Sequence, residues 1–206
     1  MSNVYILLDR SGSMETQWKE ALGSINGYVE ELPAKTRVML AVFDSNGYDV
    51  IRSTTAKEWK PVSREDASPR GGTPLFDASM RMMQRIEEDK PDRAVFVVMT
   101  DGEENQSQKY RQHEVKAMAD KLRQKDYEVL FLGANFDKVG DTAAAYGAGS
   151  AKWMNMTTAN MGDAMRGLGA MTASYTTTGA AMNFTDDAKA KATGIGTFTT
   201  GTTGKK

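Results

Sequence analysis

The chain has 206 residues, of which 40% are hydrophobic and 26% charged, with a formal net charge of −1. This balance is typical of a globular protein, and it excludes an overall basic field for nucleic acid or an anionic membrane. The absence of cysteine excludes disulfides, thiolate metal sites and a cysteine nucleophile. No apolar run approaches the ~20 residues that span a bilayer. The start lacks the basic region of a signal peptide, so we expect a cytoplasmic protein.

The first half of the chain contains apolar patterns that predict three strands and two helices. Residues 4–8 are an unbroken apolar run, typical of a strand buried on both faces. The next segment carries an apolar stripe at spacings of three and four residues, which predicts a helix. Asn46-Gly47 predicts a hairpin turn and therefore an antiparallel edge strand after it. The expected elements are a strand at 4–8, a helix at 14–32, strands at 37–43 and 48–54, an irregular stretch at 55–73, and a helix at 74–89.

The second half continues the alternation and then changes in composition. Residues 94–99 are the most hydrophobic run of the chain and predict a central strand. After Tyr175, Thr, Gly, Ala and Lys dominate, so we expect one domain at 1–178 and a largely flexible tail at 179–206. Thr185 is a candidate N-cap for one short helix in that tail. The other expected elements are a helix at 109–125, a strand at 127–132, a helix at 136–146, a short strand at 151–154, and a helix at 158–174.

Strands that alternate with helices predict an α/β fold. The sheet should be doubly wound and mostly parallel, with one antiparallel edge strand and helices on both faces. In such sheets, ligands bind outside the carboxyl ends of the strands. This rule directs attention to three places: just after Leu8, just before Pro74 and just after Met99.

Polar fragments occupy all three places. Asp9-Arg10-Ser11-Gly12-Ser13 follows the first strand, Thr100-Asp101-Gly102 follows the central strand, and Gly71-Gly72-Thr73 precedes a helix. Each fragment alone has an ordinary interpretation, as an N-cap, a turn or a helix start. Together they bring two carboxylates and three hydroxyls to one edge of the sheet, with glycines that let the backbone approach closely.

This set of oxygen donors suits a hard cation. Mg²⁺ takes six oxygen ligands in near-octahedral geometry and usually keeps some water. If the carboxylates act mostly through water, the ion stays electrophilic, and a carboxylate from outside would complete its coordination. We therefore predict a site for Mg²⁺, with Mn²⁺ and Ca²⁺ as alternatives. Its predicted ligands are Asp9, Ser11, Ser13, Thr73 and Asp101.

The order and context of these fragments resemble the metal-ion-dependent adhesion site of the von Willebrand factor type A family. The resemblance covers about residues 2–178 and implies a Rossmann-like sheet. It also implies that Ser11, Ser13 and Thr73 contact the metal through hydroxyls, whereas Asp9 and Asp101 act directly or through water. The open position is typically filled by a Glu or Asp of a partner protein.

A second resemblance is to compact, stand-alone bacterial and bacteriophage members of the same family. It is carried by three stretches of sequence: Phe131–Asp137, Ser174–Gly179 and Phe184–Asp187. The bulky Arg10 departs from the family pattern at a position that we expect to tolerate variation.

The leading hypothesis is a non-enzymatic module that binds an acidic residue of a partner protein. A structural or assembly role, in a virion or another large complex, is an alternative that the composition of the tail permits. A Mg²⁺-dependent phosphoester hydrolase of the haloacid dehalogenase type is less favoured, because Ser11 stands where that chemistry needs a second aspartate. The lone His113 leaves no histidine-based triad. We interpret Glu103 and Glu104 as solvated loop charges.

Overall fold

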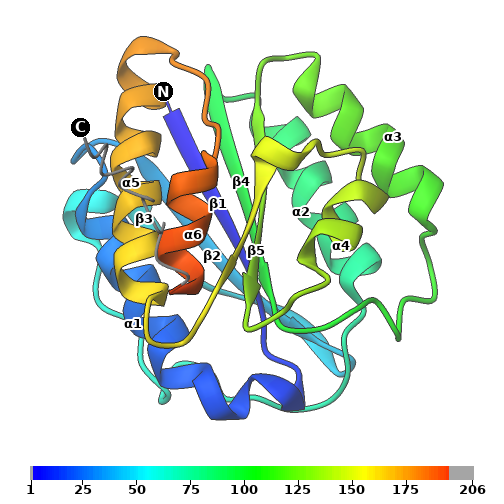
Figure 1. Cartoon of the computed structure of the whole chain (residues 1–206). Coiled ribbons are helices and arrows are strands. Elements are labelled where there is room, and N and C mark those ends of the chain that lie inside the picture. Colours follow the sequence, from blue (N-terminus) through cyan, green and yellow to red (C-terminus); the bar gives the residue numbers. More distant parts are fainter. Residues whose placement is uncertain (1, 195–206) are drawn as a thin grey trace, which may run out of the picture.

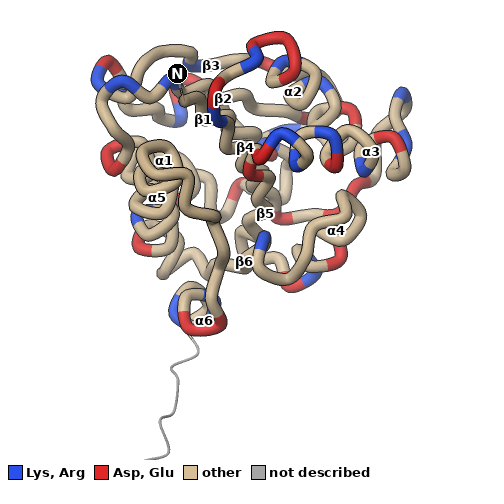
Figure 2. Tube along the Cα trace, turned by 90° about the horizontal axis from the view of Figure 1, so that it is seen from above, with Lys and Arg blue, Asp and Glu red and all other residues tan. Residues whose placement is uncertain are grey.

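Residues 2–194 are described by a computed structural model, in which one six-stranded sheet lies between two layers of helices (Figures 1 and 2). The strand order is β3-β2-β1-β4-β5-β6, and every neighbouring pair is parallel except β2 and β3. The predicted Rossmann-like α/β class, with one antiparallel edge strand, is confirmed. The strands are β1 (Ser2–Asp9), β2 (Arg37–Asp44), β3 (Gly47–Thr55), β4 (Arg93–Thr100), β5 (Glu128–Ala134) and β6 (Trp153–Met156).

Helices cover both faces of the sheet, α1, α5 and α6 on one side and α2, α3 and α4 on the other (Figure 2). The side chains of β1 alternate between two cores: Ile6 and Leu8 face α1 and α5, whereas Tyr5 and Leu7 face α2. Burial on both faces explains the unbroken apolar run of this strand. The helices are α1 (Trp18–Glu30), α2 (Leu75–Asp89), α3 (Gln112–Arg123), α4 (Val139–Ala145), α5 (Met161–Thr178) and α6 (Asp186–Thr193).

Several predicted helices differ from the structure at their ends, and the first helix and α5 are two examples. A 3₁₀ helix at Gly12–Gln17 precedes α1, so the segment predicted as one helix begins with a tighter turn. Helix α5 begins three residues later than expected and continues to Thr178. It ends at Gly179, which adopts a left-handed φ of 81° and donates its backbone N–H to Tyr175 O at 2.8 Å. This glycine stop signal was present in the sequence.

Residues 179–194, which we expected to belong to a flexible tail, pack against the sheet and α5. Met182, Phe184 and Ala192 are each no more than 4% exposed and belong to the same core as α1 and α5. Thr185 caps α6 as expected, accepting a hydrogen bond from the backbone of Ala188 at 3.1 Å. The rest of the expected tail, 195–206, lies outside the described residues.

Helices α1 and α5 approach each other closely at Gly169. A Cβ atom at this position would lie 2.6 Å from Glu31 Cβ and 2.9 Å from the backbone oxygen of Tyr28. Because backbone atoms cannot move aside cheaply, we expect Gly169→Ala to lower the free energy of unfolding by about 1–3 kcal/mol. Urea denaturation followed by circular dichroism measures this change.

Gly167, on the same helix, is the matched control because a Cβ there meets nothing within 4 Å. Alanine has the higher helix propensity, so Gly167→Ala should raise the free energy of unfolding by about 0.5–1 kcal/mol. Equal shifts in the two variants would contradict the close approach of α1 and α5.

Candidate metal centre

The three polar fragments meet at the carboxyl edge of the sheet because β1 lies between β2 and β4. Leu8 pairs with Met99, and Asp9 pairs with Phe43, so the residues after β1 and β4 leave the sheet side by side. The Thr73 hydroxyl lies beside the loop after β4, 3.7 Å from where a Cβ on Gly102 would stand. All five predicted site residues are therefore brought to one place.

Asp9 is the buried centre of this group, with no exposure to solvent. One carboxylate oxygen accepts the backbone N–H of Ser11 at 2.7 Å, and the other accepts the Thr100 hydroxyl at 2.7 Å. Burial raises the pKa of Asp9 to about 6, against the hydrogen bonds from Thr100 and Ser11 and with a further contribution from the charge of Asp101. Within residues 2–194, no cationic side chain forms an ion pair with this carboxylate.

A chain of hydroxyls links the rest of the site. Ser11 Oγ lies 3.1 Å from Ser13 Oγ, and Ser13 Oγ donates to Asp101 Oδ1 at 2.7 Å. Burial raises the pKa of Asp101 as well, although hydrogen bonds from Ser13 and Gln17 oppose that shift. Thr73 is 3% exposed, and its hydroxyl forms no hydrogen bond with any of residues 2–194.

Backbone contacts hold the Thr73 loop against the first motif. Gly12 N–H donates to Gly71 O at 3.0 Å, and Thr73 N–H donates to Asn105 Oδ1 at 3.0 Å. Gly71 has a φ of 69°, and a Cβ there would lie 2.5 Å from Ser45 Oγ. Both the left-handed backbone and the close approach require glycine at this position.

Arg10, at the position that we expected to tolerate variation, is a buried structural part of the site. It is 5% exposed, and its guanidinium donates to Asp44 at 2.5 Å and to Asp49 at 2.5 Å. Arg70 donates to the same Asp44 oxygen at 2.9 Å. Burial raises the pKa of Asp44, but the hydrogen bonds from Arg70 and Asn46 and the charge of Arg10 outweigh it, so its pKa is below the ordinary value. These ion pairs fasten the motif to the β2–β3 turn.

The two glutamates beside the site have different roles. Glu103 is exposed and pairs with Lys138 at 2.5 Å, in agreement with a solvated loop charge. Glu104, by contrast, accepts the backbone N–H groups of Phe76 at 2.7 Å and Ser107 at 2.6 Å. It therefore ties the loop after β4 to the first turn of α2, close to Thr73.

The chemistry of these donors fits a hard divalent cation. Two carboxylates and three hydroxyls offer oxygen alone, which is the preference of Mg²⁺, Mn²⁺ and Ca²⁺. No group of three or more His, Cys, Asp or Glu side chains that could hold a metal occurs within residues 2–194, so this part of the chain offers no competing carboxylate cage or imidazole site. The Thr73 hydroxyl, which forms no hydrogen bond with residues 2–194, offers a further neutral oxygen to a cation at this edge of the sheet.

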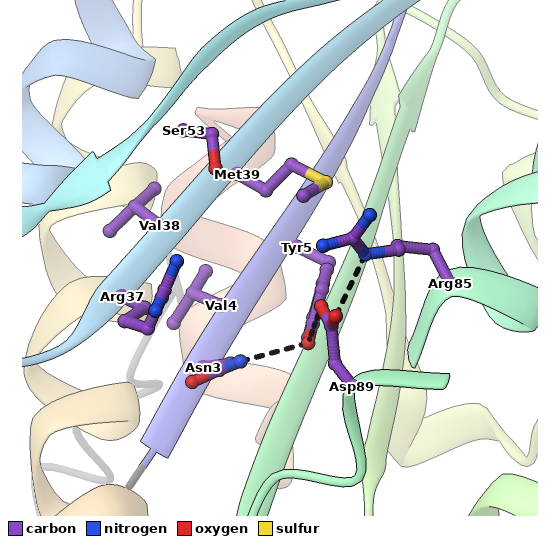
Figure 3. Close-up of a pocket in the computed structure, with 9 residues that line it drawn as sticks. All are labelled: Asn3, Val4, Tyr5, Arg37, Val38, Met39, Ser53, Arg85 and Asp89. Carbon is purple, nitrogen blue, oxygen red and sulfur yellow. Dashed lines mark hydrogen bonds and ion pairs between the residues drawn. The ribbon is translucent and has the colours of Figure 1, made fainter. Parts of the chain in front are cut away.

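A separate cavity of about 300 Å³ lies near the amino ends of β1 and β2, beside the last turns of α2 (Figure 3). Four of its polar side chains bond to one another: Asn3 donates to the Tyr5 hydroxyl at 2.9 Å, Tyr5 donates to Asp89 at 2.8 Å, and Arg85 pairs with Asp89 at 2.8 Å. This network joins β1 to α2 and brings no group toward the carboxyl edge of the sheet, so we assign the cavity no part in the candidate site.

A family model for the von Willebrand factor type A domain matches residues 3–161. The chain belongs to the von Willebrand factor type A family. The motifs that resemble the metal-ion-dependent adhesion site thus occur in a member of this family. They lie at the carboxyl edge of the sheet, as predicted. A search of curated proteins gave no match.

Solved structures of von Willebrand factor type A domains share the fold at low identity. The domain of the pilus tip protein Mfa5 from Porphyromonas gingivalis is 10% identical with a TM-score of 0.64, over 82% of this chain and 93% of that chain. A protein from Catenulispora acidiphila is 15% identical with a TM-score of 0.57, over 84% and 42%. Proximal thread matrix protein 1 of the mussel byssus, in a structure described with a zinc-occupied MIDAS motif, is 12% identical with a TM-score of 0.62, over 84% and 46%.

This von Willebrand factor type A chain spans less than half the length of the Catenulispora and mussel proteins that it matches. At these identities the likeness establishes the fold. Among residues 2–194, no helix combines the length and the apolar character that crossing a lipid bilayer requires.

The buried Asp9 predicts a pH-dependent response to divalent cations. Its raised pKa means that its contribution to stability is fully present below the ordinary value of 3.8 and is lost as the pH rises through about 6. A dication favours the charged carboxylate, so MgCl₂ should raise the Tm little at about pH 5 and fully at about pH 7.5. Differential scanning calorimetry in MgCl₂ and in EDTA measures the difference.

Asp9→Asn provides the control for that measurement, because an amide of the same shape cannot titrate. We expect the effect of MgCl₂ on its Tm to be small at both pH values. A wild-type response of the same size at both pH values would show that Asp9 does not govern cation binding.

Proposed function

We propose that the chain is a protein-binding module that holds a divalent cation, Mg²⁺ in the first instance, and uses it to bind an acidic residue of a partner protein. The proposed ligands are Asp9, Ser11, Ser13, Thr73 and Asp101. The observation that carries this proposal is the meeting of the buried Asp9 carboxylate and the half-buried Asp101 carboxylate with three hydroxyls, one of which has no hydrogen-bond partner among residues 2–194.

Different residues of the chain hold the ion and keep it electrophilic. The Ser13 hydroxyl donates a hydrogen bond to Asp101, which leaves the lone pairs of its oxygen for a cation. Asp9 is engaged by the Ser11 N–H and the Thr100 hydroxyl, which fixes its orientation. When bound, the cation supplies a concentrated positive charge that attracts an anionic oxygen from outside.

Several findings support binding over catalysis. Family members of known structure include a pilus tip protein and a thread matrix protein, and the mussel protein is described with zinc in its adhesion site. Position 11 carries serine where a phosphoester hydrolase of the haloacid dehalogenase type would need aspartate. We therefore propose that the module acts without turnover. The proposal of a cytoplasmic location rests on the sequence alone.

A role in assembly is the second candidate, and the same pilus and thread-matrix neighbours favour it. In that case a second copy of the chain, or another subunit, would supply the acidic residue. Light scattering in MgCl₂ and then in EDTA separates the two candidates, because a metal-linked assembly dissociates in EDTA while a monomeric module keeps its mass.

The direct test is capture of partner proteins on the immobilised chain in MgCl₂, compared with capture in EDTA. Thr73→Ala removes one proposed ligand, so we expect capture in MgCl₂ to fall at least about tenfold, toward the level in EDTA. Thr177→Ala is the matched control because Thr177 is an exposed threonine of α5 and not a proposed ligand, and its capture in MgCl₂ should equal that of wild type.

Isothermal titration of the same variants with MgCl₂ distinguishes loss of metal from loss of fold. Thr73→Ala should keep its circular dichroism spectrum while its affinity for Mg²⁺ falls. Undiminished capture in EDTA, or in Thr73→Ala, would be incompatible with the proposed function.

A further inference from the structure

A buried glutamine stands directly behind the candidate metal centre. Gln17, the last residue of the 3₁₀ helix that follows the motif, is 3% exposed. Its side-chain amide donates to Asp101 Oδ2 at 3.0 Å and to the backbone oxygen of Ala134 at 2.9 Å. Removing a polar side chain from water this completely costs free energy, and the hydrogen bonds of Gln17 must offset that cost.

The orientation of the Gln17 amide is fixed by what surrounds it. Asp101 and Ala134 both present oxygen acceptors, so the NH₂ end must face them. On the other side, Asn135 Nδ2 donates to Gln17 Oε1 at 2.9 Å. Each end of the amide therefore meets a group that only that end can satisfy.

Asn135 is itself held in place. It adopts a left-handed φ of 54°, which asparagine tolerates better than most residues. Its Nδ2 also donates to Thr158 Oγ1 at 2.6 Å, and its Oδ1 accepts the Thr158 backbone N–H at 3.3 Å. Side chains from the ends of two strands and the 3₁₀ helix thus form one connected network that ends on Asp101.

The two oxygens of Asp101 have separate partners in this network. Oδ1 accepts the Ser13 hydroxyl at 2.7 Å, and Oδ2 accepts Gln17. Because both of its oxygens accept hydrogen bonds from the protein, Asp101 would act on a bound cation through the Ser13 hydroxyl and not as a direct ligand. Outer contacts of this kind orient the groups that hold a metal and tune its charge.

We propose that Gln17 is a positioning residue that reserves Asp101 for the Ser13 hydroxyl and thereby keeps a bound cation electrophilic toward an outside carboxylate. This inference rests on the proposed function. Without the Gln17 donor, Oδ2 loses its protein partner and becomes available to the cation. Each added anionic ligand lowers the attraction that the cation retains for a further carboxylate.

The inference predicts that cation affinity and carboxylate capture change separately, which a merely structural role of Gln17 would not produce. In Gln17→Met, which is similar in length but cannot donate, the affinity for the cation should be undiminished. Capture of a carboxylate should fall by about tenfold or more. Local loosening of the site would instead weaken both together.

The experiment uses the full chain with Mn²⁺ as the metal and acetate as the simplest carboxylate. Electron paramagnetic resonance measures free Mn²⁺ and gives the affinity for the cation. The relaxation of water protons by bound Mn²⁺ falls as acetate displaces water, and so it reports carboxylate capture. Before acetate is added, the water-proton relaxation rate of the Mn²⁺-loaded Gln17→Met variant should be lower than that of wild type, because Asp101 would replace a water ligand of the ion.

Two further variants complete the design. Asn135→Gly keeps the left-handed backbone and removes the contact that orients the Gln17 amide, so it should show a smaller change in the same direction. Gln108→Met alters an exposed glutamine at the same edge of the sheet and should match wild type. Thermal unfolding of each variant without metal identifies any that fails to fold.

The outcomes separate the two proposals. If wild-type protein takes up no Mn²⁺, the proposed function fails and the role of Gln17 fails with it. If wild type takes up Mn²⁺ and captures acetate, the role of Gln17 is overturned by a parallel loss of both affinities in Gln17→Met. It is also overturned by wild-type behaviour in Gln17→Met and Asn135→Gly.

Discussion

The burial of the Asp9 carboxylate is the constraint on which the carboxyl edge of the sheet depends. A charged oxygen pair without solvent is costly unless every lone pair finds a donor or a counter-ion. The fold supplies a backbone N–H from Ser11 and a hydroxyl from Thr100, yet the pKa of Asp9 remains raised because burial outweighs these hydrogen bonds, with a smaller contribution from the charge of Asp101. The site is therefore incomplete by its own electrostatics, and a dication would relieve that imbalance.

The sheet topology brings the residues of this site together. Because β1 lies between β2 and β4, residues that are far apart in the chain leave the sheet at one edge. Arg10 and Arg70 both pair with the buried Asp44, and they thereby fasten the loop after β1 and the loop before α2 to the β2–β3 turn. Breaking one partner of such a group leaves an uncompensated charge, so these side chains fix the loops in one geometry.

At this edge, the groups that would bind a cation differ from the groups that would control its attraction for a partner carboxylate. Neutral hydroxyls approach the site from the first motif and from the Thr73 loop, while Gln17 and Asn135 stand behind Asp101. Electrophilicity toward a partner is in this view a property of the outer network as much as of the proposed ligands. Specificity for one partner would then depend on surfaces around the edge that the ligands themselves do not form.

The sequence by itself determined the α/β class, the order of its elements and the residues of the candidate site. Apolar periodicity and the short motifs that contain Asp9, Ser11, Ser13, Thr73 and Asp101 can each be recognised within a few neighbouring residues. It did not reveal the partners of Arg10, Gln17 or Asn135. Those side chains form hydrogen bonds with residues up to 118 positions away, and such pairings depend on strand register and loop geometry. Nor did it reveal the packing of residues 179–194, since a few apolar side chains such as Met182 and Phe184 are buried only when α5 and β6 offer them a surface. Tertiary structure alone decided these features, because a polar or weakly apolar side chain has no partner until the fold brings one to it.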